Sequence, residues 1–249
     1  IYIPDSFDKP HMVLTDYRCY MRYERGKNPM AINQIEDAIR SREKNSEKIR
    51  EYLDKRHREL QKLVKNNSAI NFSIVPHFLE KERFDIFSPK TEKAVDLFMR
   101  NNIVKGRFLP TFDGFISSDR GDDFEYRQLL IQSTGYLELF LFIPYRDKLP
   151  ATWFSDELMK FFETAAEFYS ELDLFFKGWF HAEFFNMINF SLKLDEKNRR
   201  EQNKLIVNKE GYFSLPNIGF SDFTRDYTDI NRKANDFLWR KFGLSRSYL

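Results

Sequence analysis

The residues whose types and spacing best suit a chemical role lie within the first thirty positions. Residues 20–30 read YMRYERGKNPM, so large apolar and cationic side chains alternate up to a glycine turn. Guanidinium forks match phosphate oxygens, a glycine turn lets backbone N–H groups approach an anion, and a tyrosine ring can stack on a base. The pattern predicts a nucleic-acid-binding surface formed by Arg18, Tyr20, Arg22, Arg25 and Lys27.

The same alternation has a second interpretation. Arginine and tyrosine side chains can simply cover the edge of a sheet and hinder pairing with another strand. Strands that alternate apolar and polar residues are common, so the spacing alone favours this structural role.

The residues around this stretch indicate how it is positioned. Residues 12–23 have the period of a strand, with Arg18, Tyr20 and Arg22 on one face. Residues 25–28 form the expected turn. We expect a helix to follow from about 34 to 65, with Asn33 as its N-cap and Glu36 reaching back to the cap.

This helix would be long and highly charged, with more lysines and arginines than carboxylates. Opposite charges three or four residues apart would stabilise it as a solvated connecting helix. The alternative is a homo-oligomer in which the helix packs against its twin. The apolar stripe for that contact consists of Ile35, Ile39, Ile49, Leu53 and Leu60.

The rest of the chain mixes strands and helices irregularly, which predicts an α+β fold with mixed or antiparallel sheets. Its 27 phenylalanines predict a core of rings in offset or edge-to-face contact. We expect strands at 70–75, 184–194, 205–207 and 212–215, a hairpin closed at 133–135, and helices at 89–101, 155–176 and 229–242. The expected domains are 1–33, 34–66 and 67–249: terminal strands, connecting helix and Phe-rich domain.

Charge and cysteine content limit the function classes. The net charge of +2 permits nucleic-acid binding only where cations cluster. The single cysteine, Cys19, excludes an internal disulfide and is predicted to be a core residue. No apolar run approaches the roughly 18 residues of a membrane span, so we expect a cytoplasmic protein with no membrane partner.

No catalytic constellation can be assembled from these residues, and we expect no cofactor. His11, His57, His77 and His181 are too far apart for a metal site defined by spacing. The chain has neither a Gly-x-Ser-x-Gly elbow nor a phosphate-binding Gly-x-x-x-x-Gly-Lys loop.

The order of motifs resembles the distal part of bacterial proteins that carry a Schlafen-type, Alba-like DNA-binding domain. The resemblance spans nearly the whole chain and is most specific at 4–60 and 235–247. It includes "FDGF" at 112–115 and "NDFLWRKFGLSRS" at 235–247. The matching residues of the first part are Pro10, His11, Val13, Tyr20, Arg22, Gly26, Lys27, Pro29 and Met30.

The resemblance implies nucleic-acid binding, in a prokaryotic defence or regulatory context. Because the chain opens on Ile1-Tyr2-Ile3-Pro4, we expect it to be the C-terminal part of a longer protein. The acidic residues that make some Schlafen relatives nucleases would precede Ile1, so no nuclease role is carried over. The alternative function is a non-enzymatic oligomerisation or assembly module.

Overall fold

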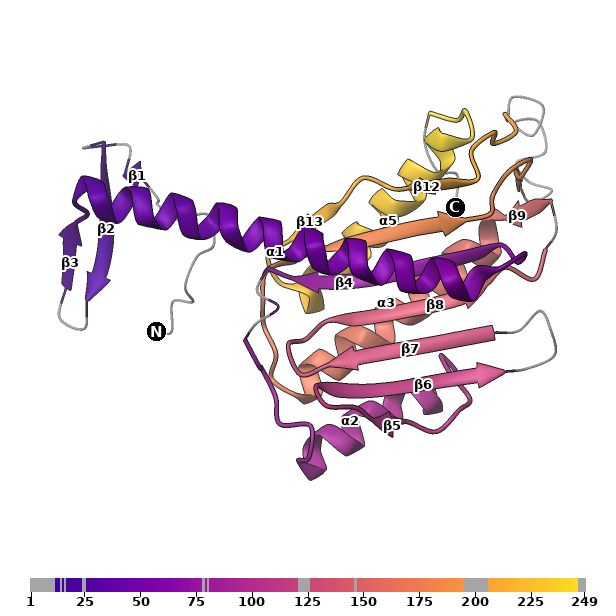
Figure 1. Ribbon diagram of the computed structural model, residues 1–249, viewed down its shortest axis with the longest axis horizontal. Coiled ribbons are helices and arrows are strands. Elements are labelled where there is room, and N and C mark those ends of the chain that lie inside the picture. The colour runs from indigo at the N-terminus through magenta and orange to yellow at the C-terminus, as the bar shows by residue number, and fades with distance from the viewer. Residues whose placement is uncertain are drawn as a thin grey trace. The chain divides into compact units, whose positions relative to one another are not determined.

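The computed structural model describes residues 12–13, 15, 17–23, 26–77, 79, 81–120, 126–145, 147–194 and 206–245. The chain forms two compact units, Ile1–His57 and Arg58–Leu249, and the boundary falls within helix α1 (Ile32–Val64). Helices and mainly antiparallel sheets make the fold α+β, as the sequence predicts (Figure 1). The expected domain borders at residues 33 and 66 stay a prediction.

The N-terminal unit contains a small antiparallel sheet followed by most of α1. Its strands, in spatial order, are β1 (Met12–Val13), β2 (Arg18–Tyr23) and β3 (Gly26–Pro29). The predicted N-cap at Asn33 is wrong, because the helix already begins at Ile32. Gln34, and not Glu36, reaches back: its Oε1 accepts a hydrogen bond of 2.9 Å from the backbone N–H of Ala31.

The C-terminal unit is built on an eight-stranded sheet. Seven strands follow one another in the order β12-β10-β4-β8-β7-β6-β5, and β13 also pairs with β10. A parallel pair, β9 (Lys148–Pro150) and β11 (Ser191–Lys193), stands apart from it. The strands of the large sheet are β4 (Ala69–Pro76), β5 (Leu109–Pro110), β6 (Gly114–Arg120), β7 (Tyr126–Gln132), β8 (Leu137–Phe142), β10 (Gly178–Phe185), β12 (Tyr212–Ser214) and β13 (Ile218–Phe220).

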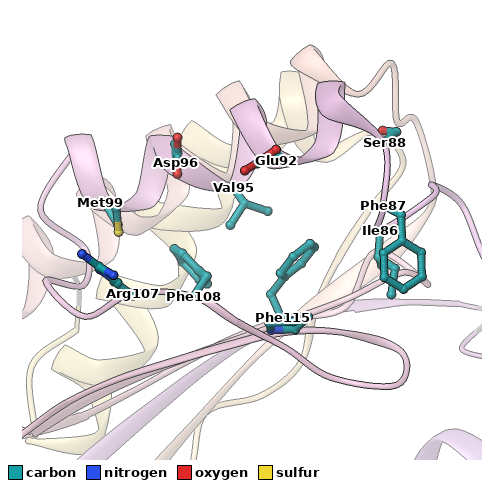
Figure 2. Close-up of a pocket in the computed structure, with 11 residues that line it drawn as sticks. Ile86, Phe87, Ser88, Glu92, Val95, Asp96, Met99, Arg107, Phe108 and Phe115 are labelled. Atoms are coloured by element: carbon teal, nitrogen blue, oxygen red, sulfur yellow. The ribbon is translucent and has the colours of Figure 1, made fainter.

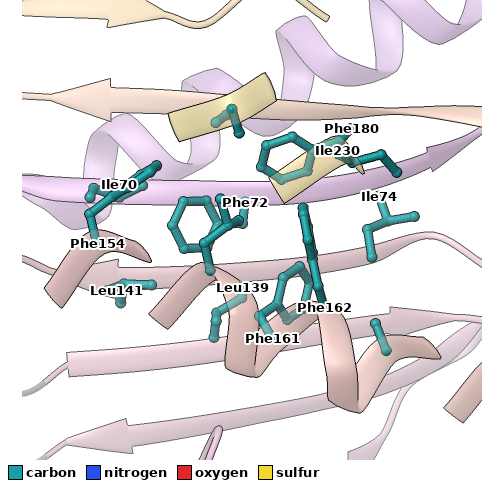
Figure 3. Packing of buried hydrophobic residues seen from close by; sticks show 14 of the residues in the cluster. Ile70, Phe72, Ile74, Leu139, Leu141, Phe154, Phe161, Phe162, Phe180 and Ile230 are labelled. Atoms are coloured by element: carbon teal, nitrogen blue, oxygen red, sulfur yellow. The ribbon is translucent and has the colours of Figure 1, made fainter. Parts of the chain in front are cut away.

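One face of this sheet packs against three helices around an aromatic core (Figure 3). The helices are α2 (Pro89–Arg100), α3 (Ala151–Glu171) and α5 (Phe223–Lys241). From the central strand β4, Phe72 meets the Phe154 ring of α3 edge-on at 5.7 Å. Phe162 of α3 makes edge-on contacts with Phe180 at 4.9 Å and with Phe223 at 5.3 Å. The predicted core of phenylalanine rings is thereby confirmed.

Close backbone approach explains the glycine of the FDGF stretch. A Cβ atom at Gly114 would lie 1.9 Å from the carbonyl oxygen of Ile131 on the neighbouring strand. Gly135, in the predicted turn between β7 and β8, has a φ of +86°, which favours glycine. Both glycines therefore help to set the β6-β7-β8 meander.

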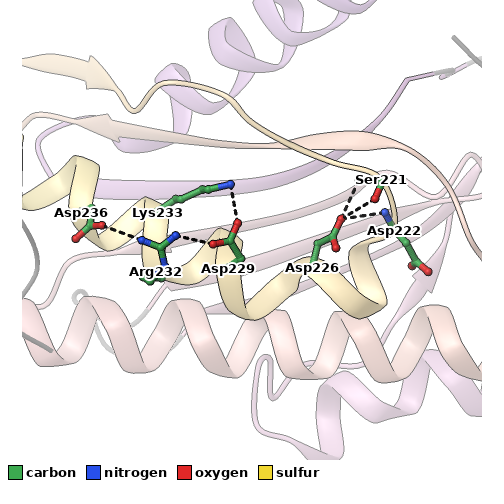
Figure 4. A network of polar contacts seen from close by, with 7 residues as sticks. All are labelled: Ser221, Asp222, Asp226, Asp229, Arg232, Lys233 and Asp236. Atoms are coloured by element: carbon green, nitrogen blue, oxygen red, sulfur yellow. Dashed lines mark hydrogen bonds and ion pairs between the residues drawn. The ribbon is translucent and has the colours of Figure 1, made fainter. Parts of the chain in front are cut away.

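Helix α5 begins earlier than the sequence pattern predicted, at Phe223 rather than at about Asp229. The carboxylate of Asp222 caps it by accepting a hydrogen bond from the backbone N–H of Thr224 at 3.1 Å. Asp226 reaches back, and its Oδ2 accepts from the backbone N–H of Ser221 at 2.9 Å (Figure 4). Ser221, Asp222 and Asp226, which all precede the predicted start, thus form the capping hydrogen bonds of the first helical turn.

The far end of α5 follows the prediction. Gly243 has a φ of +90°, and the N–H of Leu244 donates to the carbonyl of Trp239 at 3.0 Å. This is the geometry of a Schellman motif. Trp239 is fully buried, and Asp236 lies 3.5 Å from Arg232 on the same helix (Figure 4).

The strand predicted at 184–194 is confirmed only at its ends, because residues 184–185 belong to β10, residues 191–193 form β11, and no strand connects them. Strand β10 ends at Phe185, and the chain turns through Asn186 and Asn189, which have φ angles of +53° and +65°. Asn186 holds this turn in place, because its side-chain amide donates to the carbonyls of Lys65 and Asn67, each at 2.9 Å. Residues 206–207 of the strand predicted at 205–207 form no strand either, and residue 205 lies outside the described residues.

Candidate functional site

The pairing of β2 with β3 places four of the five predicted binding residues on one face. Arg22 lies opposite Lys27, and Tyr20 lies opposite Pro29. Residues directly opposite in an antiparallel pair share a face, as do alternate residues of one strand. Positions 18, 20, 22 and 27 therefore fall on the same side of the small sheet.

The structure describes the side-chain surroundings of only Arg18 and Tyr20 among these five residues. Arg18 is exposed and Tyr20 is half-buried, and each interacts with other residues of the protein. Arg25 lies outside the residues that the structure describes. Cys19, predicted as a core residue, is only half-buried. The backbone thus brings Arg18, Tyr20, Arg22 and Lys27 to one face, and Arg25 stays a prediction.

A second group of polar residues, which the sequence did not predict, crosses the centre of the large sheet. Tyr136 donates a hydrogen bond of 2.7 Å to Glu138 Oε2, and its hydroxyl lies 3.3 Å from Ser73 Oγ. The side-chain amide of Asn71 contacts Ser73 Oγ at 3.2 Å and Glu183 Oε2 at 3.3 Å. All five residues are buried. We call Asn71, Ser73, Tyr136, Glu138 and Glu183 the polar row.

A histidine extends the polar row at the β10 side. The Nδ1 atom of His181 lies 2.7 Å from Asn217 Oδ1, and its Nε2 atom lies 3.9 Å from Glu183 Oε1. Tyr212 donates to the same carboxylate oxygen at 2.8 Å. Burial by itself would lower the pKa of His181, but hydrogen bonding to Glu183, the charge of Glu183 and the contact with Asn217 together raise that pKa above its ordinary value.

Most groups of the polar row hydrogen-bond to one another, which compensates for their burial. In the part of the chain that the structure describes, the side-chain oxygen of Asn71 is buried without a hydrogen-bond partner. Among the described residues, no group of three or more His, Cys, Asp or Glu side chains is placed to hold a metal ion. The sequence signal was a single carboxylate within each of two apolar strands, LELFLF and GWFHAEFF.

A third feature is a pocket of about 520 Å³ between α2 and strands β5 and β6 (Figure 2). The rings of Phe108 and Phe115 lie opposite Val95 of α2, and Glu92 and Asp96 lie on the same helix. The sequence pattern predicted α2 as a separate element and did not indicate that it would lie against β5 and β6. No sequence motif predicted this site.

Comparison of the chain with models of protein families, with characterised proteins and with solved structures gives no match. The resemblance to Schlafen-type, Alba-like proteins therefore stays a prediction. Within the described residues, no helix combines the length and the apolar character that crossing a bilayer requires. Function is therefore inferred from the geometry of the sites themselves.

Proposed function

We propose that the N-terminal unit binds nucleic acid through the face of β2 and β3 that carries Arg18, Tyr20, Arg22 and Lys27. The observation that supports this proposal is the strand register, in which Arg22 lies directly opposite Lys27. Like charges directly opposite each other destabilise a strand pair. A polyanion bound over both residues would turn that repulsion into attraction.

The cationic side chains and the tyrosine ring have different roles in this proposal. Arginine and lysine side chains bind phosphate oxygens, which sets affinity and position without reading sequence. A tyrosine on the same face offers a stacking surface to an unpaired base. The resemblance to Schlafen-type, Alba-like DNA-binding proteins points to the same class of ligand.

Salt dependence tests the proposal. We expect fluorescence anisotropy with labelled duplex DNA, single-stranded DNA and RNA to give an affinity that falls steeply with salt. Removing one cation that binds a phosphate should reduce the slope of log K against log salt by roughly 0.9 on duplex DNA. The Arg22→Ala/Lys27→Ala variant should therefore flatten the slope by about 2 units if both residues bind phosphates.

A matched variant tests whether binding depends on this face or only on the net charge of the protein. Arg40 and Lys44 are exposed cations of α1 in the same unit, so Arg40→Ala/Lys44→Ala removes the same charge elsewhere. We expect this variant to keep the original slope, and circular dichroism to show that both variants fold. An unchanged slope in the Arg22/Lys27 variant, or equal flattening in both, would refute the proposed face.

A second candidate function is assembly through α1. Of the predicted oligomer stripe, Ile39 is 37% exposed, whereas Ile49 and Leu60 are buried within the chain, so only the part of the stripe near Ile39 is open to a partner. Light scattering measures the mass in solution, and Ile39→Glu should dissociate an oligomer held by this stripe. An oligomer without affinity for nucleic acid would favour assembly over the first proposal.

A further inference from the structure

An extended groove lies at the β5 edge of the large sheet. Its first part is the pocket of about 520 Å³, which has Arg107 and Met99 at one end and Phe87 at the other (Figure 2). Its apolar lining consists of Ile86, Val95, Met99, Phe108, Pro110 and Phe115.

A second pocket adjoins the first. It measures about 540 Å³ and shares Ile86 and Phe87 with its neighbour. The Phe87 side chain, between the two, is 82% exposed, and Phe112 on the wall of the second pocket is fully exposed. Two adjoining hollows with exposed rings suit a chain segment with several apolar anchors better than one compact ligand.

The groove is acidic. Glu92 and Asp96 stand one helical turn apart on α2, and among the described residues neither carboxylate has a hydrogen bond or an ion pair. Like charges at this spacing destabilise a helix. The second pocket adds Glu82 and Asp85.

The basic residues of the groove offset this charge only in part. Arg83 in the second pocket is directed inward: its Nε donates to the carbonyl of Thr134 at 2.8 Å, and its guanidinium lies 4.9 Å from the centre of the Phe176 ring. Arg107 stands at the far end of the first pocket. A partner that carries lysine or arginine would complement the carboxylates of Glu92 and Asp96.

The strand beside the groove disfavours binding by strand addition. β5 is the edge strand of the sheet and consists only of Leu109 and Pro110. Proline lacks the N–H that a pairing strand would need, and so short an edge offers few hydrogen bonds. Two adjoining pockets beside a pair of carboxylates fit an amphipathic helix that places its apolar face in the groove.

We propose that this groove docks a cationic amphipathic helix of a partner protein. Apolar side chains about one turn apart on that helix enter the two pockets on either side of Phe87. Its lysines or arginines pair with Glu92 and Asp96. This binding activity belongs to the C-terminal unit and is independent of the nucleic-acid proposal.

Two labelled peptides test the proposal on the full chain. The first is a designed helix of roughly 14 residues, about four turns, with leucine on one face and lysine on the other. The second has glutamate in place of every lysine. We expect the lysine peptide to bind with an affinity at least tenfold higher in fluorescence anisotropy, and Glu92→Lys/Asp96→Lys to lower it by roughly tenfold, because two ion pairs are removed.

Three variants keep the test specific. Glu163→Lys/Glu171→Lys changes the net charge equally at exposed positions of α3, and we expect affinity within about twofold of the unmodified protein. Phe87→Ser, at a side chain too exposed to support the fold, should weaken binding without lowering the unfolding temperature. Arg22→Ala/Lys27→Ala should leave peptide binding unchanged, which separates this site from the nucleic-acid face.

Equal affinity for the two peptides, no binding of either, or the same loss in the α3 variant as in the α2 variant would each overturn the proposal. Full affinity in Phe87→Ser would also overturn it, because the peptide would then bind elsewhere.

Discussion

The two faces of the large sheet are built from the same strands and yet depend on different interactions. Alternate residues of β4 show the contrast: Ile70, Phe72 and Ile74 enter the aromatic core, whereas Asn71 and Ser73 join the polar row on the opposite face. Every residue of β4 is buried, so both faces are covered. Leu60 and Val64 of α1 pack with Ala69 on the polar-row side.

The contrast shows that the two buried faces contribute to stability through different interactions. On the aromatic face, stability depends on filled volume, because ring contacts are many, weak and short-ranged. On the polar face, it depends on whether each hydroxyl, amide and carboxylate keeps its partner. Substitutions that change volume alone and those that remove one polar atom should therefore have distinct effects on the two faces.

The largest expected effect comes from emptying the aromatic face. Phe162 is fully buried between Phe180 and Phe223, and Phe162→Ala should lower the free energy of unfolding by about 3–5 kcal/mol. Urea denaturation followed by circular dichroism measures this loss. Phe162→Leu fills most of the same space and should cost about 1 kcal/mol. If both substitutions cost the same, volume does not govern this face.

A smaller effect should follow from removing one oxygen atom on the polar face. Tyr136→Phe deletes the hydroxyl that donates to Glu138, a hydrogen bond to a carboxyl group that should be worth about 1.5–3 kcal/mol of unfolding free energy. Tyr169→Phe is the matched control, because its hydroxyl donates to the neutral backbone carbonyl of Gly135 and should be worth about 1 kcal/mol. Equal losses in urea denaturation would show that the carboxyl group adds nothing.

The smallest expected effect is a dependence on pH. Burial lowers the pKa of His181, but Glu183 and Asn217 more than offset it, so the folded protein holds the proton more tightly than the unfolded chain. This contribution to stability is fully present below the unfolded pKa of about 6.5 and is lost as pH rises through the higher folded pKa.

The His181→Gln variant isolates that contribution. The difference in unfolding free energy between the original protein and the variant should be larger at pH about 5.5 than at pH about 8.5, since the unfolded pKa is near 6.5. The difference cancels the titration of the other histidines. A difference that does not change with pH would mean that His181 is not stabilised in its charged form.

Local sequence signals predicted several elements closely. The apolar run of β4, the helix that begins at Pro89 and the turn at Gly135 all form near the predicted positions. For the helix and the turn the deciding interaction is local: Ser88 caps α2, and glycine adopts the positive φ that the turn requires. Signals of this kind need no information about distant residues.

Some failures are local, because the starts of α1 and α5 lie earlier than predicted, but the failure within 184–194 involves a contact between distant parts of the chain. Residues 184–194 alternate like a strand, but the side chain of Asn186 binds carbonyls more than a hundred positions earlier in the sequence and fixes a turn instead. For the candidate nucleic-acid site, the sequence predicted the shared face of Arg18, Tyr20 and Arg22. Only the pairing with β3 placed Lys27 opposite Arg22.

The sequence by itself determined the α+β class, the phenylalanine-rich core and the alternation of cations along β2, because residue type and period specify these locally. The tertiary structure alone decided that Glu138 and Glu183 share one polar row and that α2 and β5 enclose an acidic groove. For the polar row the physical reason is strand order: β4 pairs with β8 and β10, which lie far along the chain, and which side chains become partners is settled only when those strands pair. The groove joins segments that are close in sequence, and only the packing of α2 beside β5 and β6 encloses it.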